Sequence, residues 1–193
     1  MGSKLKAVSV WVLAILVVSS FAFAQEEGES KKEFKYVGAK KCMPCHMSPA
    51  KGAQYKQWMG TKHANAYKTL GTDQSKEVAK EAGIEGNPQE AAECLTCHVT
   101  GYEAPDSHKI EKYDMTEGIS CESCHGPGSE YWKMPVMMGI SKGTMDPAEY
   151  GLEEPTEETC VQCHNEESPT FKGFDYEEAY QAITHPNPQN KEE

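Results

Sequence analysis

The sequence predicts a mainly α-helical fold of short helices and long loops, and three observations lead to it. No segment shows the alternation of apolar and polar residues that is expected of a half-buried strand. Several short stretches instead carry helical spacing or capping residues. Aliphatic residues are also scarce, so the helices cannot pack around a conventional core and must be held around something else.

Residues 1–24 have the features of a secretory signal peptide. Two lysines precede an apolar run, and the small-residue pattern at 22–24 predicts cleavage before Gln25. An uncleaved anchor helix is the alternative, but the apolar run is short for a membrane span. We therefore expect an exported protein, periplasmic or extracellular, in which residues 25–193 form a single domain.

The first predicted helices follow from apolar spacing. Over residues 49–70, apolar side chains recur at steps of four and three and include His63 on the same face. Gly60 is expected to kink this helix. Residues 74–82 predict a second helix, which Gly83 would stop.

Two further helix starts are predicted from capping residues. The sequence NPQE offers Asn87 as the N-cap, Pro88 as the first helical residue and Glu90 at the third position. Asp175 is the predicted N-cap of a C-terminal helix that stops at Pro186.

The predicted domain lacks the apolar residues of an ordinary core. Leu, Ile, Val and Phe total 16 of the 169 residues that follow the signal, whereas a highly charged chain with less than about 20% of them is expected to be disordered. Burying so few side chains cannot offset the loss of conformational entropy. Either the chain is disordered or a bound group supplies apolar surface.

The charge of the chain disfavours one class of partner and suits another. The net charge is -11, or -13 once the two signal lysines are removed, and there is no arginine. Such a surface repels phosphate groups, which argues against a nucleic-acid partner. It suits a partner with a basic docking patch, although an acidic surface that only faces solvent has the same composition.

All eight cysteines fall into four copies of a C-x-x-C-H motif, which is the attachment signature of c-type haem. Cysteines three positions apart lie on one side of a helical turn, so both can bond to one porphyrin while the next histidine reaches the iron. The predicted attachment residues are Cys42, Cys45, Cys94, Cys97, Cys121, Cys124, Cys160 and Cys163. The predicted iron ligands within the motifs are His46, His98, His125 and His164.

Zinc and disulfides are the alternative uses of paired cysteines. Four C-x-x-C pairs could make two zinc ribbons, and disulfides fit an exported protein. Neither requires a histidine after every second cysteine, and here it follows four times out of four. The sequence therefore predicts four covalently bound haem c groups, which supply the missing apolar surface and on which folding depends.

The histidine count limits how the four irons are ligated. Four irons have eight axial positions, and the chain has seven histidines. The histidines outside the motifs are His63, His108 and His185. At most three haems can therefore have two histidine ligands. Methionine is the alternative sixth ligand, and Met134, Met137 and Met138 follow closely after Tyr131. These methionines also suit gap-filling beside a haem.

The order of the motifs resembles that of the tetrahaem cytochrome c-554 family. The shared landmarks, which cover residues 36–185, are YVGAKKCMPCH, QWMGTKHANAYKTL, CLTCHVTGY, GISCESCHGPG, CVQCH and FKGFDYEEAYQAITH. The resemblance implies three haems with two histidine ligands and a five-coordinate second haem. It also implies that His63 crosses over to the fourth haem and that His185 serves the third.

The stretch after the third motif departs from the family pattern. In the family, the second ligand of the first haem follows the H-G-P-G turn, whereas HGPGSEYWKMPVMM contains no further histidine. His108 then either replaces that ligand on the first haem or closes the second haem, and we favour the first option. Tyr131 is expected to contact a haem without ligating its iron.

The sequence thus predicts an exported tetrahaem c-type cytochrome that carries electrons between redox partners through closely packed haems. No membrane span is expected after signal removal, and no acid or base motif of an enzyme is visible. Two alternatives stay open. One is an enzyme that reduces or oxidises a small nitrogen or oxygen species at a haem with an open sixth position. The other is a subunit of an extracellular cytochrome filament, formed by self-association into a haem wire.

Overall fold

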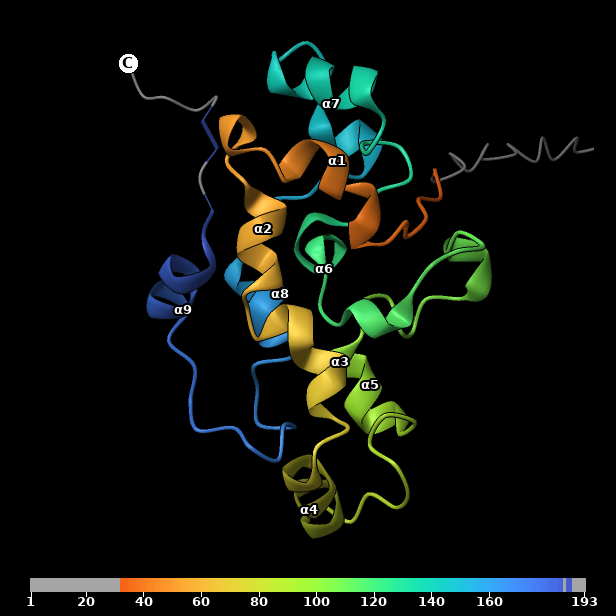
Figure 1. Ribbon diagram of the computed structural model, residues 1–193, viewed down its shortest axis with the longest axis vertical. Helices are drawn as coiled ribbons and strands as arrows, with labels where there is room; N and C mark the ends of the chain where they lie inside the picture. The colour runs from red at the N-terminus through yellow and green to blue at the C-terminus, as the bar shows by residue number, and fades with distance from the viewer. Residues whose placement is uncertain (1–31, 186, 189–193) are drawn as a thin grey trace, which may run out of the picture. The chain divides into compact units, whose positions relative to one another are not determined.

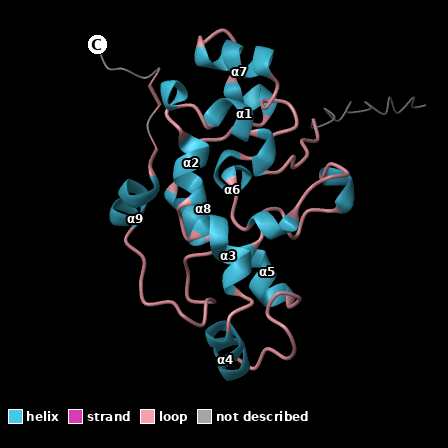
Figure 2. Cartoon of the chain, viewed as in Figure 1, coloured by secondary structure: helices cyan, strands magenta, loops and turns pink. Residues whose placement is uncertain are grey.

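The computed structural model describes residues 32–185 and 187–188 (Figure 1). The predicted signal peptide lies outside these residues. From Glu33 onward the chain makes one compact unit. Figure 2 shows short helices joined by loops, and the described residues contain no β-strand. The predicted fold class is confirmed. None of the described helices is long and apolar enough to cross a membrane.

The helices follow one another at short intervals along the chain. The α-helices are α1 (Met43–His46), α2 (Gln54–Met59), α3 (Ala66–Thr69), α4 (Asp73–Glu81), α5 (Ala92–His98), α6 (Cys121–His125), α7 (Met134–Ser141), α8 (Glu157–Val161) and α9 (Tyr176–Ile183). The 3-10 helices are η1 (Ala39–Lys41), η2 (Pro49–Lys51), η3 (His63–Asn65), η4 (Asp106–His108), η5 (Met115–Glu117) and η6 (Pro147–Tyr150).

The helical face predicted over residues 49–70 is interrupted in the structure. α2 ends at its cap Gly60, and η3 and α3 follow as separate turns. The indole of Trp58 donates to the carbonyl of Ile119 at 2.8 Å, and the Ile119 N–H donates to the carbonyl of His63 at 3.0 Å. The helix is therefore broken at Gly60 and not only kinked. Ile119, which lies just before α6, is hydrogen-bonded to residues on both sides of this break.

Two of the other predicted helices are confirmed. α4 covers nearly the expected range and is followed by Gly83, which has a positive φ of 75°. At the start of α9, the carboxylate of Asp175 accepts a hydrogen bond from the N–H of Glu178 at 3.0 Å. This bond satisfies one of the free N–H groups of the first turn, as expected of an N-cap. α9 ends at Ile183, and Pro186, its predicted stop, lies outside the described residues.

The helix start predicted at Asn87 is wrong. The Asn87 side chain accepts the N–H of Gln89 at 3.2 Å, but this bond closes a turn, and α5 begins only at Ala92. The side chain of Gln89 donates to the carbonyl of Tyr67 at 3.2 Å. The turn is thereby held against α3, and this long-range contact outweighs the local capping signal.

The apolar core of the described residues is small. Leu70, Leu95 and Val99 pack together where α3 meets α5. Other apolar side chains are exposed, and several of them lie within the first motif or follow the first and third motifs: Met43, Met47, Trp132, Met134 and Met138. The polypeptide alone buries little apolar surface, as its composition predicts.

The segment that precedes α1 is held on two sides. The Tyr36 N–H donates to the carbonyl of His108 at 2.8 Å, and the Ile110 N–H donates to the carbonyl of Tyr36 at 3.0 Å. On the other side, Lys35 and Ser129 exchange two hydrogen bonds of 3.0 Å. The lead-in to the first motif is therefore packed against the turn that follows the third.

Candidate haem-binding sites

Each C-x-x-C-H motif forms a turn that presents its two cysteines and its histidine together. α1, α5 and α6 each end at the motif histidine. The fourth motif leaves α8 at Val161 and continues as a turn, in which the His164 N–H donates to the Cys160 carbonyl at 3.0 Å. None of the eight cysteines forms a disulfide in the described part of the chain. This is the local geometry that the attachment spacing requires.

Three motif histidines are oriented by a hydrogen bond from Nδ1. His98 donates to the carbonyl of Ala66 at 2.9 Å, His125 donates to the carbonyl of Glu153 at 3.1 Å, and His46 donates to the side-chain oxygen of Gln54 at 3.2 Å. Each acceptor is a C=O oxygen, so Nδ1 carries the proton. Nε2 is then left with the lone pair that binds a metal.

The fourth motif histidine is oriented by an aromatic contact. The ring of His164 stacks on Phe174, with ring centroids 4.8 Å apart and planes 17° apart. Phe174 directly precedes Asp175, the N-cap of α9. The docking of the α9 segment therefore also fixes the plane of a motif imidazole.

Two motif histidines face a second histidine from a distant part of the chain. The ring centroids are 6.0 Å apart for His63 and His164 and 5.9 Å apart for His125 and His185. Two imidazoles that bind one metal ion, each through a bond of about 2 Å, have centroids about 6 Å apart. Burial, and then the neighbouring histidine, lowers the pKa of both His63 and His185. The neutral imidazole, which is the metal-binding form, is therefore favoured.

The backbone around Gly118 positions His63. Gly118 has a φ of 75°, and a Cβ atom there would lie 2.7 Å from the carbonyl oxygen of His63. The Gly118 carbonyl accepts hydrogen bonds of 3.0 Å from both the N–H and the hydroxyl of Thr100. Sequence reasoning missed this glycine, because nothing in its local sequence distinguishes it from any loop glycine.

The other histidines have no such partner ring. In the part of the chain that the structure describes, no histidine ring lies against His46 or His98. The Nε2 atom of His108 lies 3.5 Å from the carboxylate of Glu33. The structure thus brings His63 and His185 to motif histidines and leaves His108 outside these pairs. Ligation by His108 stays a prediction.

The stretch after the third motif lies beside the first. Tyr131 is 4% exposed, and its hydroxyl donates to the carbonyl of Gly126 at 2.6 Å. Lys41, which precedes the first motif, places its ammonium 4.9 Å from the centre of a Trp132 ring. Met134 and Met138 follow on α7 and are 64% and 48% exposed. The Tyr131 hydroxyl is engaged with backbone, which agrees with a packing role.

The four motifs approach one another in a definite order. The neighbouring Cys121 raises the pKa of Cys42, so the first motif lies beside the third. α6 packs against α8, which joins the third motif to the fourth. Burial, followed by the neighbouring Cys97, raises the pKa of Cys163 to about 12 and joins the fourth motif to the second. The spatial order is first, third, fourth, second.

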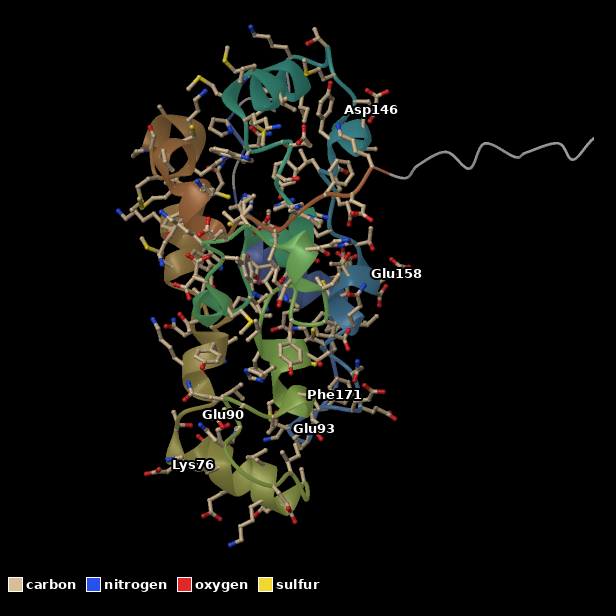
Figure 3. All side chains as sticks on the ribbon, turned by 90° about the vertical axis from the view of Figure 1, so that its right-hand side faces the viewer. Lys76, Glu90, Glu93, Asp146, Glu158 and Phe171 are labelled. Carbon is tan, nitrogen blue, oxygen red and sulfur yellow. The ribbon has the colours of Figure 1, made fainter. Side chains whose placement is uncertain are left out.

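Charge differs sharply between the surroundings of the first and fourth motifs. Residues 34–72 contain seven lysines and no acid, and all seven lysines are exposed. Residues 143–185 contain eleven acids and one lysine, all exposed. In Figure 3, Asp146 and Glu158 of the acidic region stand on the side away from the helices of the lysine-rich region. The net negative charge is therefore concentrated around the fourth motif.

Comparisons with known proteins agree with this geometry. Residues 41–126 match the family model described as cytochrome c554 and c-prime. Cytochrome c-554 of Nitrosomonas europaea is 30% identical over 174 residues, which are 84% of this chain and 72% of that protein. The chain belongs to the cytochrome c-554 family. No solved structure was found to match it.

Membership of the cytochrome c-554 family implies a c-type cytochrome that carries electrons between redox partners through covalently bound haem. The residues present fit that cofactor. Free cysteines are available at the attachment spacing, motif imidazoles are oriented through Nδ1, and two imidazole pairs have the separation of metal ligands.

Proposed function

We propose that the chain is an exported tetrahaem electron carrier in which each C-x-x-C-H motif holds one haem c. The pairing of His63 with His164 and of His125 with His185, at 6.0 and 5.9 Å, carries this proposal. Neither a zinc ribbon nor a disulfide needs a second histidine ring at that separation from the motif histidine. Bound haem supplies an iron that takes up and releases one electron.

The chain's own residues would hold the ligands still while the charge of the iron changes. His164 and His63 are the proposed ligands of the fourth haem, and His125 and His185 those of the third. The hydrogen bonds and ring contacts that orient the motif histidines would hold their Nε2 atoms in place to bind the iron. Fixed ligands limit the structural rearrangement that accompanies each electron transfer.

The order of the motifs supports a single path for electrons. The first and second motifs lie at its two ends, and the third and fourth motifs lie between them. The acidic surroundings of the fourth motif suit a redox partner with a basic docking patch. The predicted signal peptide supports export to the periplasm or the cell exterior.

A second candidate function rests on the surroundings of His98. No histidine ring lies against it in the described part of the chain. An iron bound there would have an open sixth position for a small nitrogen or oxygen species. Binding of cyanide or nitric oxide to the purified ferric protein, followed by EPR, tests this candidate. An unchanged spectrum would reject this candidate, and electron transfer would be the one proposed function that is left.

Haem stoichiometry tests the main proposal. The protein is expressed in a host with working c-type maturation and examined by a pyridine haemochrome assay and by intact mass. We expect four covalent haems on a chain that begins at Gln25. Zinc in place of iron, or fewer than four haems, would overturn the proposal.

A further inference from the structure

Glu122, inside the third motif, is a buried acid. It is 2% exposed, and its two carboxylate oxygens accept hydrogen bonds from three backbone N–H groups. Val37 donates to both oxygens at 2.9 and 3.1 Å, Gly38 donates at 2.7 Å, and Gly128 donates at 2.7 Å. Among the described residues, no lysine or histidine lies within ion-pair distance of this carboxylate.

The hydrogen bonds indicate that Glu122 is ionised. Every recorded partner is an N–H donor, and each oxygen accepts two of these bonds. A protonated carboxyl group would direct its O–H at one of these donors and would lack an acceptor. Burial raises the pKa of Glu122, and the three N–H groups oppose that shift. The site therefore holds a negative charge that is compensated only by neutral dipoles.

The charge lies between two attachment sites. Glu122 follows Cys121, which lies beside Cys42, and its carboxylate accepts N–H groups from the segment just before the first motif. The negative charge of Glu122 contributes to raising the pKa of Cys42 and, after burial, that of Tyr131. The carboxylate therefore acts electrostatically on both the first and the third motif from a place with little water to screen it.

The turn after the third motif is shaped to admit the carboxylate. A Cβ atom at Gly128 would lie 3.0 Å from an oxygen of Glu122 and 3.1 Å from Val37. A side chain at Gly128 would crowd the carboxylate and Val37, so its absence favours the close approach of the Gly128 N–H. The second glycine of the H-G-P-G turn therefore makes room for the hydrogen bond between its own N–H and the Glu122 carboxylate.

We propose that the buried carboxylate of Glu122 lowers the reduction potentials of the first and third haems. This inference rests on the proposed tetrahaem function. Each reduction takes one electron from the redox partner and removes one positive charge from the iron. A fixed negative charge stabilises ferric iron more than ferrous iron, so it disfavours the electron at these two haems relative to the other two.

The test is Glu122→Gln in the haem-loaded protein, with an EPR-monitored redox titration that resolves individual haems. We expect the reduction equilibrium of the first and third haems to shift about tenfold toward the ferrous form, which is 59 mV for one electron. The matched control is Glu93→Gln. Glu93 precedes Cys94 of the second motif but is exposed, so water and salt should screen its charge and leave the potentials unchanged.

A second pair of variants covers the case in which the Gln variant does not fold. Ser129 lies next to Gly128 and is only partly buried. Ser129→Lys should raise the potentials of the first and third haems, and Ser129→Glu should lower them, with the other two unmoved. Unshifted potentials in these variants, or equal shifts at all four haems, would overturn the inference. Wild-type protein with fewer than four haems would instead overturn the proposed function.

Discussion

The histidines of the second and third motifs are held alike on their Nδ1 side and differ on the opposite side. His98 and His125 both donate from Nδ1 to a backbone carbonyl, at 2.9 and 3.1 Å. Yet His125 faces the ring of His185, whereas no histidine ring faces His98 in the described part of the chain. Backbone carbonyls that lie 32 and 28 residues away in the sequence orient the Nδ1 side of these two imidazoles. Packing between distant segments decides whether a second ligand stands opposite.

The largest expected effect comes from removing the paired histidines. His63→Ala and His185→Ala should each convert one low-spin ferric iron to the high-spin state, because each removes one of two strong axial ligands. EPR of the oxidised protein measures this. His108→Ala is the matched comparison, because His108 faces no motif histidine in the described part of the chain and its ligation is still to be tested. A new high-spin signal for His108→Ala and none for His185→Ala would contradict the pairing.

A smaller effect is expected at Gly118, which supports His63. Gly118→Ala places a Cβ atom 2.7 Å from the carbonyl of His63, whereas Gly83 has the same φ of 75° and nothing within 4 Å. Both changes cost about 1 kcal/mol of backbone strain or more. Only Gly118→Ala should also push His63 away and add high-spin iron. Equal losses of thermal stability and identical EPR spectra in the two variants would argue against a supporting role.

The smallest effect is expected at the helix that leads to His185. Asp175→Ala removes the N-cap of α9, and Thr72→Ala removes the equivalent cap of α4. Each should cost about 1 kcal/mol of stability. Only the Asp175 variant should weaken ligation of the third haem, seen as a temperature-dependent growth of high-spin signal. If the two variants behave alike, α9 does not control His185.

The fold class was predictable because its signals are local. The cap at Asp175, the helix over 74–82 and the four motif turns depend on neighbouring residues, and the structure contains them. The continuous helix over 49–70 was not found, because a hydrogen bond from Trp58 to the distant Ile119 secures a break. The helix start predicted at Asn87 was likewise not found, because the nearby Gln89 side chain is hydrogen-bonded to α3.

In the candidate sites, too, some residues follow from local sequence and others depend on contacts between distant segments. The attachment cysteines and motif histidines are predicted from spacing alone. The pairings of His63 and His185 came only from the family resemblance, because no local pattern tells which iron a distant histidine reaches. The burial of Glu122 could not be predicted, since its N–H partners Val37 and Gly38 come from a segment far away in sequence.

The most direct test of the central claim is to count the irons with two histidine ligands. Near-infrared magnetic circular dichroism of the ferric protein, normalised to the haemochrome value, measures this number. The paired rings at 6.0 and 5.9 Å predict at least two such irons per chain. Three would show that His108 also serves as a ligand. Fewer than two would contradict the pairing of His63 with His164 or of His125 with His185.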